Sequence, residues 1–452
     1  MDQRPRVLLI AEACNPEWVS VPLEGWSHAQ AISRIADVHL VTQIRNREAI
    51  LRAGLVEGEQ FTSIDSERIT RPTYKIASLL RGGPGKGWTT LTALMSLAYP
   101  YFEWLIWRRF GAAIRTRQYD VVHRLTPLSP TAPSLLAGKC RRAGVPFIVG
   151  PLNGGVPWPK GFDAARRQER EWLSYIRGIY QLLPGIRATR RNASALLIGS
   201  HDTWDQTPAK YHHKCIYVPE NAIDPTRFRT LRTRAAARPL KVVFVGRLVP
   251  YKGADMLLEA AAPLIRSGDV QVTIIGDGPQ MPELRSLVAR EILTENVRFT
   301  GWVKHGEIQT ILANMDVLGF PSIREFGGAV VLEAMAVGVV PIIVNYGGPA
   351  ELVTLDTGFA VAMGTRSQIV QRFRAILTQL VSSPETIDRM SARAIDHVRN
   401  NFTWDAKAGA VLEVYKWLMN PNLPIPAFPR PFRGTGESAT TPQIYSEPGS
   451  GT

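Results

Sequence analysis

The sequence predicts an α/β protein with two doubly wound, parallel sheets, one in each half of the chain. At 452 residues the chain is too long for one compact core and suits two domains. Short, strongly apolar runs alternate along it with segments whose apolar residues recur at helical spacing. Strands that are apolar throughout are typical of parallel sheets covered by helices on both faces. The apolar share of 45% is that of an ordinary folded protein.

The first half shows this alternation in short pieces. Strands are expected at residues 6–11, 38–41, 120–123, 147–149 and 195–198, and a helix at 25–35.

The second half is more regular. Strands are expected at 241–245, 270–275, 297–300, 317–320 and 339–344, and helices at 254–265, 281–290, 307–315 and 329–337. This order predicts a doubly wound sheet.

Composition shifts predict the domain boundaries. We expect an N-terminal domain at 1–228, a basic linker at 229–240, a C-terminal domain at 241–402, a helix at 403–419 that returns to the N-terminal domain, and a tail at 420–452. Pro, Gly, Ser and Thr dominate the tail, which predicts disorder there.

Several classes of protein are disfavoured. Cys14, Cys140 and Cys215 are far apart, so the spacing fits neither a disulfide framework nor a metal site, and a reducing compartment is expected. The N-terminus is typical of a first strand and its loop rather than a signal peptide. No stretch has the length and purity of a membrane span.

The net charge of +14 is concentrated in the first half of the chain. Residues 1–230 hold 31 Lys and Arg against 19 Asp and Glu, whereas residues 231–452 hold 22 against 20. Such a field attracts anionic partners such as acidic lipid, a pyrophosphate carrier or nucleic acid.

A strand, a Gly-containing loop and a helix around residues 317–337 predict an anion site. The free N–H groups at the start of such a helix suit a diphosphate. Glu325 lies in the loop and Glu333 about two turns into the helix, so the two carboxylates could grip hydroxyls at opposite ends of an extended ligand. A plain strand–loop–helix with two solvated carboxylates is an equally good interpretation of the spacing.

Residues 246–253 (GRLVPYKG) follow another strand at the same edge. Arg247 and Lys252 would place two cations near the anion site, where they could stabilise the charge of a leaving diphosphate.

Seven stretches follow one another along the chain: VPENAIDPTRF, GRLVPYKG, IIGDGP, FTGWV, the stretch from Glu325 to LEAMAVG, YGGPAELV and NFTWDAKAGAVLEVY. In this order they resemble the motifs of the retaining family-four glycosyltransferases, the glycosyl transferases of group 1. The resemblance covers most of residues 215–419 and is loose in the first half. It implies the GT-B fold, in which two Rossmann-like domains face a cleft, with the acceptor bound by the N-terminal domain and the nucleotide sugar by the C-terminal one.

The resemblance also implies roles for single residues. Arg247 and Lys252 would neutralise the donor diphosphate, Glu325 would hydrogen-bond the donor sugar, and Glu333 would hold the ribose. His123 matches an active-site histidine of the family. The residues expected to be catalytic are His123, Arg247, Lys252 and Glu325, and those expected to bind the donor are Gly25, Gly246, Arg247, Lys252, Gly276, Gly328, Ala329, Val330 and Glu333. This chain departs from the family pattern at Phe326, which follows Glu325 directly, and at Asn221-Ala222.

No cofactor is expected. The sequence contains no D-x-D motif that would hold a metal–diphosphate complex, so we predict an enzyme that is independent of metal ions, with Arg247 and Lys252 in place of the cation.

Two basic segments rich in aromatic residues, 94–109 and 164–191, are candidates for contact with the acceptor side. Each alone is slightly better read as an ordinary core-facing helix. Together with the basic first half, they favour a cytoplasmic protein that associates peripherally with an anionic membrane surface and acts on a glycan or a lipid-linked intermediate of surface polysaccharide.

Three alternatives stay open at this point: a phosphorylase or an epimerase on the same fold, or a non-catalytic nucleotide-binding protein. A nucleic-acid partner is disfavoured because no known binding module is present. A dehydrogenase is disfavoured because G-x-G-x-x-G is missing after the first strand.

Overall fold

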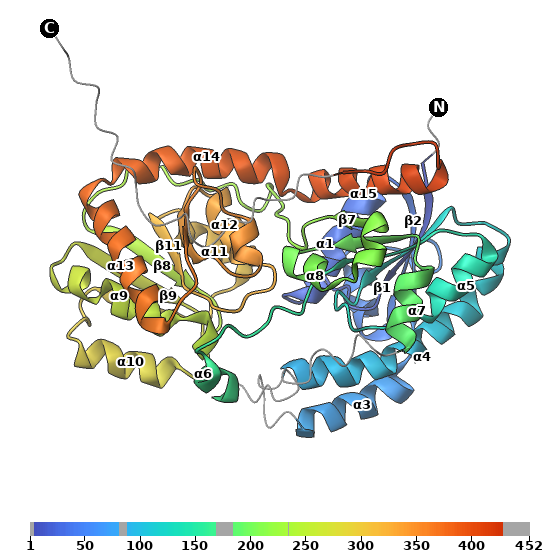
Figure 1. Ribbon diagram of the computed structural model, residues 1–452, viewed down its shortest axis with the longest axis horizontal. Coiled ribbons are helices and arrows are strands. Elements are labelled where there is room, and N and C mark those ends of the chain that lie inside the picture. The colour runs from blue at the N-terminus through green and yellow to red at the C-terminus, as the bar shows by residue number, and fades with distance from the viewer. Residues whose placement is uncertain (1–3, 81–87, 169–183, 234, 428–452) are drawn as a thin grey trace, which may run out of the picture.

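A computed structural model describes residues 4–80, 88–168, 184–233 and 235–427. Two α/β units lie side by side, and each contains one parallel sheet (Figure 1). Most of the expected tail, residues 428–452, and the middle of the expected basic segment 164–191 lie outside the described residues.

The first unit is built on a seven-stranded parallel sheet of order β3-β2-β1-β4-β5-β6-β7. Its strands are β1 (Arg6–Ala11), β2 (Asp37–Gln43), β3 (Phe61–Ile64), β4 (Val121–Thr126), β5 (Phe147–Leu152), β6 (Ala195–Ile198) and β7 (Cys215–Tyr217). The helices in this part of the chain are α1 (Val21–Ser33), α2 (Arg47–Arg52), α3 (Glu67–Leu80), α4 (Trp88–Arg115), α5 (Leu135–Ala143), α7 (Pro184–Asn192) and α8 (His201–Gln206), together with α6 (Asp163–Gln168), which lies against the second unit. Two apolar clusters fill the two faces of this sheet, as the fully apolar strands require.

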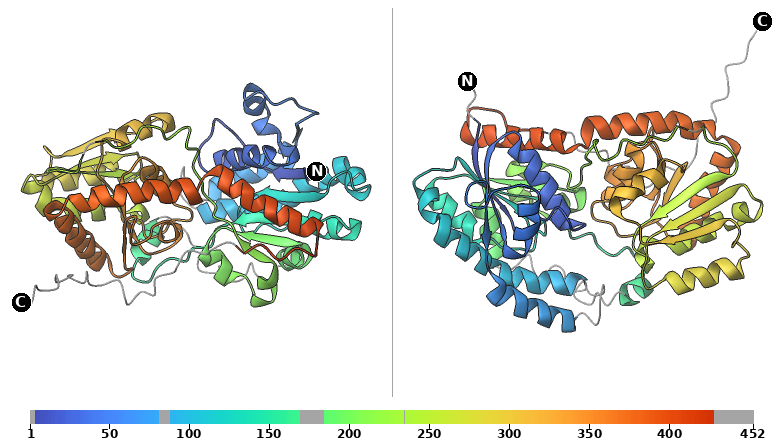
Figure 2. Two further views of the ribbon diagram at one scale, coloured as in Figure 1. Left: turned by 90° about the horizontal axis from the view of Figure 1, so that it is seen from above. Right: turned by 180° about the vertical axis from the view of Figure 1, so that it is seen from behind.

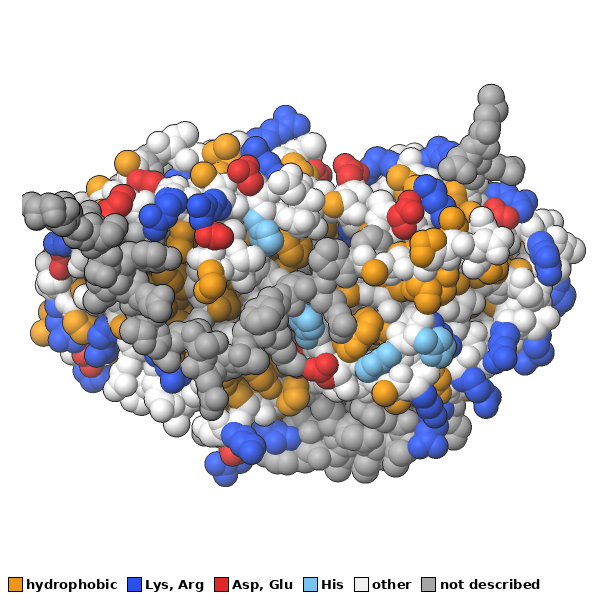
Figure 3. All heavy atoms as spheres, turned by 45° about the horizontal axis from the view of Figure 1, so that its top comes forward, with side chains coloured by type: hydrophobic (Ala, Val, Ile, Leu, Met, Phe, Trp, Pro, Cys, Tyr) orange, Lys and Arg blue, Asp and Glu red, His pale blue; other side chains and the backbone are white. Residues whose placement is uncertain are grey.

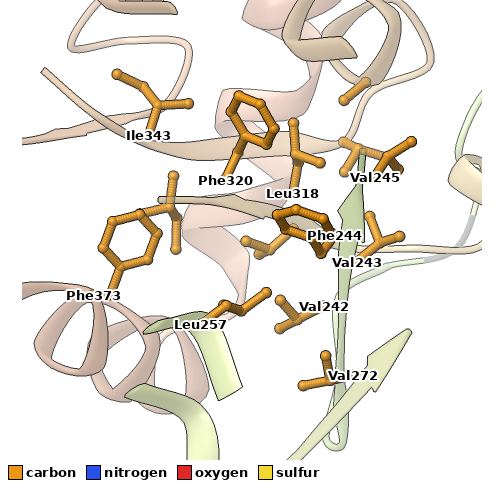
Figure 4. Close-up of a cluster of buried hydrophobic side chains, with 14 of the residues drawn as sticks. Val242, Val243, Phe244, Val245, Leu257, Val272, Leu318, Phe320, Ile343 and Phe373 are labelled. Atoms are coloured by element: carbon orange, nitrogen blue, oxygen red, sulfur yellow. The ribbon is translucent and has the colours of Figure 1, made fainter. Parts of the chain in front are cut away.

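The second unit has a six-stranded parallel sheet of order β10-β9-β8-β11-β12-β13. Its strands are β8 (Leu240–Val245), β9 (Val270–Ile275), β10 (Val297–Gly301), β11 (Val317–Phe320), β12 (Val340–Val344) and β13 (Phe359–Val361). Its helices are α9 (Ala254–Arg266), α10 (Met281–Arg290), α11 (His305–Leu312), α12 (Ala329–Ala336), α13 (Arg366–Ser382) and α14 (Glu385–Asn401). Figure 4 shows Phe244 and Phe320 of the central strands packed with Leu257 of α9 and Phe373 of α13. The predicted fold class, with two doubly wound domains, is confirmed.

The last helix, α15 (Trp404–Met419), packs on the first unit. Figures 1 and 2 show α14 and α15 running end to end along one side of the molecule, α14 over the second unit and α15 over the first. Val411 and Tyr415 are buried in the same cluster as Val7 of β1. The chain thus crosses between the units at residues 402–404, where the Ile223 N–H donates to the Phe402 carbonyl oxygen at 2.8 Å.

Residues 153–162, between β5 and α6, form a second segment that passes from the first unit to the second, called the crossing segment below. The Pro157 carbonyl oxygen accepts a 3.0 Å hydrogen bond from the Tyr346 hydroxyl, and the ring of Trp158 meets Tyr251 edge-on at 6.0 Å. Phe162 is buried in the core of the second unit, beside which α6 lies in both front and rear views (Figures 1 and 2). An N-terminal domain running to residue 228 therefore does not describe this segment, because its aromatic side chains are buried against the other unit.

Among the described residues, the structure has no helix long and apolar enough to cross a membrane. The most apolar candidate, α4, contains Pro100 and buries Glu103, whose carboxylate accepts hydrogen bonds from Ser134 and Leu136 at the start of α5.

Candidate active site

The candidate site begins where β8 and β11 end, side by side in the second sheet. Residues that leave these strands lie at the same edge, because parallel neighbours end together. The Ile323 N–H donates to the Tyr251 carbonyl oxygen at 2.9 Å, which ties the loop after β11 to the short 3₁₀ turn η5 (Pro250–Lys252). A side chain at Gly253, in its left-handed conformation, would meet the Pro321 carbonyl oxygen at 2.6 Å. The two predicted motifs are therefore in direct contact.

Lys252 and Glu325 form an ion pair across these loops although they are 73 residues apart in sequence. Each side chain is only 17% exposed. Burial, reinforced by the nearby Arg247 guanidinium, lowers the pKa of the Lys252 ammonium to about 8. The carboxylate acts in the opposite direction and stabilises the ammonium. The structure thus brings Arg247, Lys252 and Glu325 together as the sequence predicted.

The N-terminus of α12 adds main-chain donors to this group. Gly328 takes a left-handed conformation with a φ of 73° and starts the helix at Ala329. In an α-helix the first N–H groups, here those of Ala329 and Val330, have no acceptor within the helix. They lie four and five residues beyond Glu325, so an anion held by Lys252 would be close to the positive end of the helix.

The loop that carries Glu325 is held in place from both units. The Gly348 N–H donates to the Glu325 carbonyl oxygen at 3.1 Å. The Arg324 guanidinium lies between two rings, 5.0 Å from the centroid of Trp158 and 5.2 Å from that of Phe326, and donates from Nε to the Val156 carbonyl oxygen at 3.3 Å. Phe326, at its unusual position, therefore packs against the side chain that links the loop to the crossing segment.

Glu333 pairs with a histidine that the sequence analysis did not single out. His305 Nε2 lies 2.7 Å from Glu333 Oε1, and His305 Nδ1 lies 2.7 Å from Nη2 of Arg227. The Glu333 side chain is 12% exposed and that of His305 27%. A lone His at the start of a helix gave no signal that it would meet a residue 28 positions further on.

Gly246, Gly276 and Gly25 lie where two backbone segments approach each other closely. The Gly246 N–H donates to the Ile275 carbonyl oxygen at 3.0 Å, and any side chain on Gly276 would overlap the Gly246 carbonyl. A side chain on Gly25 would likewise overlap the carbonyl of Ala13 in the loop after β1. Close chain packing is sufficient to explain these glycines.

A second group of charges, also missed from sequence, lies beside Gly25 where the units meet. Lys407 of α15 donates to the main-chain carbonyl of Glu220, whose carboxylate accepts from Asn153. Burial raises the pKa of Glu24 to about 8; Lys407 opposes this shift, and Glu220 and Glu333 reinforce it. Burial lowers the pKa of Lys407 to about 8. Glu333 is close enough to influence Glu24, so this group borders a residue of the second unit that was predicted to bind the donor.

His123 is fully buried in the first unit. Its Nδ1 lies 2.7 Å from the Tyr415 hydroxyl, and its Nε2 lies 2.8 Å from the Gly150 carbonyl oxygen. Because a carbonyl only accepts, Nε2 carries the proton and Nδ1 accepts from tyrosine. Nδ1 thus holds α15 and Nε2 holds β5, so both ring nitrogens are engaged within the first unit, and this geometry does not favour the predicted contact between His123 and the donor sugar.

Among the described residues, no group of three or more His, Cys, Asp or Glu side chains is arranged to hold a metal ion.

Comparison with known proteins gives the family. Residues 232–397 match the family model described as Glycosyl transferases group 1. The chain is 29% identical over 307 residues to a GDP-mannose-dependent monoacylated alpha-(1-6)-phosphatidylinositol monomannoside mannosyltransferase of Corynebacterium glutamicum, a match that covers 65% of this chain and 75% of the relative. It is 27% identical over 304 residues to the putative colanic acid biosynthesis glycosyltransferase WcaL of Escherichia coli K12, covering 62% and 74%.

The fold is shared with solved structures. HepE of Anabaena, solved in complex with UDP, superposes with a TM-score of 0.58 at 14% identity and covers 91% of this chain and 99% of its own. The family match includes Arg247, Lys252 and Glu325, which the fold brings together at one sheet edge, and also Glu333 in α12. The chain is a glycosyltransferase with the GT-B fold that transfers a glycosyl group from a nucleotide sugar, and its residues 232–397 match the group 1 model.

Proposed function

We propose that this enzyme is a retaining hexosyltransferase that acts on a lipid-linked or surface-polysaccharide acceptor at the cytoplasmic face of a membrane. The observation that carries the donor assignment is the convergence of Arg247, the Lys252–Glu325 ion pair and the N-terminus of α12 at one sheet edge. The relatives support the acceptor class, since one is named for a phosphatidylinositol mannoside and the other for colanic acid biosynthesis.

The donor diphosphate would occupy the space between the two cations and the helix end. Its negative charge would replace the Glu325 carboxylate as the partner of Lys252, which frees Glu325 to accept hydrogen bonds from the sugar hydroxyls. Glu333, about one and a half turns into α12, would accept from the ribose hydroxyls.

In the reaction, the bond between the anomeric carbon and the diphosphate oxygen breaks, and the diphosphate keeps the electron pair. The acceptor hydroxyl forms its bond on the same face, and its proton passes to an oxygen of the leaving phosphate. Arg247, Lys252 and the α12 amides would stabilise the developing charge. These cations would supply the electrostatic role that a divalent ion has elsewhere, so we propose that transfer continues in excess chelator; loss restored by Mg²⁺ or Mn²⁺ would refute this.

A thermal-shift screen of nucleotide sugars tests the donor assignment. A donor that raises the melting temperature of the wild type should lose most of this effect in Lys252→Ala and keep it in Arg298→Ala, which removes an exposed charge from the edge strand β10. An unchanged shift in Lys252→Ala would remove the basis of the assignment.

A further inference from the structure

We propose that His305 is a positioning residue that orients Glu333 toward the ribose of the nucleotide sugar, and that Arg227 keeps His305 in the tautomer that this requires. The inference rests on the proposed function, because it takes Glu333 as the ribose ligand. The observation that carries it is the continuous chain of contacts from Arg227 through both nitrogens of His305 to Glu333.

The direction of each hydrogen bond follows from the chemistry of the end groups. A guanidinium has donors only, so Arg227 Nη2 donates to His305 Nδ1, which must be the unprotonated nitrogen. The proton of the neutral ring is then on Nε2, which donates to Glu333 Oε1 at 2.7 Å. A ring with the proton on Nδ1 would offer a lone pair to the carboxylate and repel it.

Three segments far apart in sequence supply this chain of contacts. Arg227 belongs to the connection between the two sheets, His305 is the first residue of α11, and Glu333 is in α12. The Arg227 N–H donates to the Asp224 carbonyl oxygen at 3.0 Å in a turn, and the next residue, Phe228, is buried with its ring edge-on to His305 at 6.3 Å. The imidazole is thus held by a hydrogen bond on each side and by an aromatic neighbour.

The consequence for the ligand is a carboxylate with one oxygen fixed. Glu333 Oε1 is bound by His305, and Oε2 and the remaining lone pairs can accept from vicinal hydroxyls. Without His305 the Glu333 side chain, only 12% exposed, would be free to turn to other rotamers and would lose a charge-assisted hydrogen bond. Selectivity for ribose over 2′-deoxyribose should therefore depend on His305, which would act through Glu333.

The experiment measures the dissociation constants of UDP, GDP and ADP for the wild type, selects the tightest, and compares it with its 2′-deoxy form. The wild type should prefer the ribonucleotide. His305→Ala should reduce that preference by roughly 10-fold, the scale of a hydrogen bond to a charged group. His305→Gln should restore most of it, because its amide N–H₂ can also donate to Glu333. His397→Ala, which removes another half-buried histidine of the same unit, should leave it unchanged.

Arg227→Met, which has no donor for His305 Nδ1, and the kinetics give independent readouts. Loss of Arg227 should weaken the preference less than loss of His305, because only the control of the tautomer is removed. In His305→Ala the KM for the nucleotide sugar should rise with little change in kcat, since the ribose is remote from the breaking bond.

Glu333→Ala separates the inference from the proposed function. If Glu333→Ala abolishes the ribose preference and His305→Ala does not, His305 has no positioning role and the donor assignment stands. If Glu333→Ala leaves the preference intact, the assignment of Glu333 to the ribose fails, and the role of His305 fails with it.

Discussion

The Tyr217 hydroxyl donates a 2.8 Å hydrogen bond to Glu351 Oε2 and so joins the last strand of the first sheet to the short turn η6 (Gly348–Glu351) of the second unit. The other oxygen, Oε1, accepts from the His201 N–H at the start of α8 at 2.8 Å. Glu351 is 8% exposed and Tyr217 4%. One carboxylate of the second unit is therefore bound by two donors of the first.

Tyr217→Phe should lower the melting temperature by several degrees. The substitution leaves Glu351 Oε2 buried without its donor, and a lost hydrogen bond to a charged group costs about 1.5–3 kcal/mol. Differential scanning calorimetry would measure the change. Tyr119→Phe, at the opposite, amino-terminal edge of the first sheet, is the matched control and should have a smaller effect. Equal melting temperatures for Tyr217→Phe and the wild type would show that this contact does not hold the units together.

Glu24→Gln should change how stability depends on pH. The pKa of Glu24 is raised to about 8 in the folded protein, so the folded state holds its proton above the ordinary carboxyl range while the unfolded chain releases it. The wild type should therefore lose stability as the pH rises from about 4.5 to 8, and the glutamine variant should not show this loss. Urea unfolding at pH 5 and pH 8 would measure it.

The neighbouring Lys407 changes its protonation in a different pH range, so its contribution to stability can be separated from that of Glu24. Lys407, with a pKa lowered to about 8, stays protonated in both states below that pH and contributes no slope there. Parallel slopes for Glu24→Gln and the wild type between pH 5 and 8 would contradict the burial of this carboxyl group.

His123→Ala should destabilise the protein far more than it weakens donor binding. The substitution opens a cavity under α15 and removes the partners of the Tyr415 hydroxyl and the Gly150 carbonyl, a loss of about 2–4 kcal/mol. Chemical unfolding gives the stability, and the KM for the nucleotide sugar below the melting transition gives the site effect. A tenfold or larger increase in the KM of folded His123→Ala would show that His123 does contribute to donor binding.

The fold could be predicted where single segments determine it. β8, β9 and β11 lie within one residue of their expected bounds because each is a short, mainly apolar run with most of its residues buried. The strands that were missed, β3 (FTSI), β7 (CIY) and β13 (FAV), have three or four residues and lack an aliphatic run such as ALLI of β6. Their pairing depends on the neighbouring strand rather than on their own sequence.

Only part of the site, the part that belongs to the second unit, could be predicted from the sequence. Lys252 and Glu325 follow two central strands, so the order of a doubly wound sheet already places them at one edge. Lys407 and His305 have no such signal, because α15 returns to the first unit and α11 meets α12 through tertiary packing. The burial of His123 likewise follows from Tyr415, which is 292 residues away.

The basic first unit is the basis for the last prediction, binding to anionic membranes. In α4, Trp104 is 41% exposed, stacks on Tyr101 at 5.7 Å, and carries the Arg108 guanidinium 4.9 Å above its ring. Figure 1 shows α4 beside α3 at the lower edge of the first unit, and Figure 3 shows Lys and Arg side chains gathered at the outer end of that unit. An exposed aromatic beside arginines suits the interface of an acidic bilayer.

Sedimentation with vesicles of phosphatidylcholine, alone or with phosphatidylserine, tests this binding. The protein should bind the anionic vesicles, and salt should weaken the binding because the exposed charges are screened. Replacing both Arg108 and Arg109 by Ala should lower the affinity at least tenfold, since each cation near the surface contributes about 1 kcal/mol. Arg298→Ala on the second unit should not lower it. Equal binding to neutral vesicles, or an affinity unchanged by the double substitution, would exclude α4 as the membrane contact and leave the acceptor to be sought in solution.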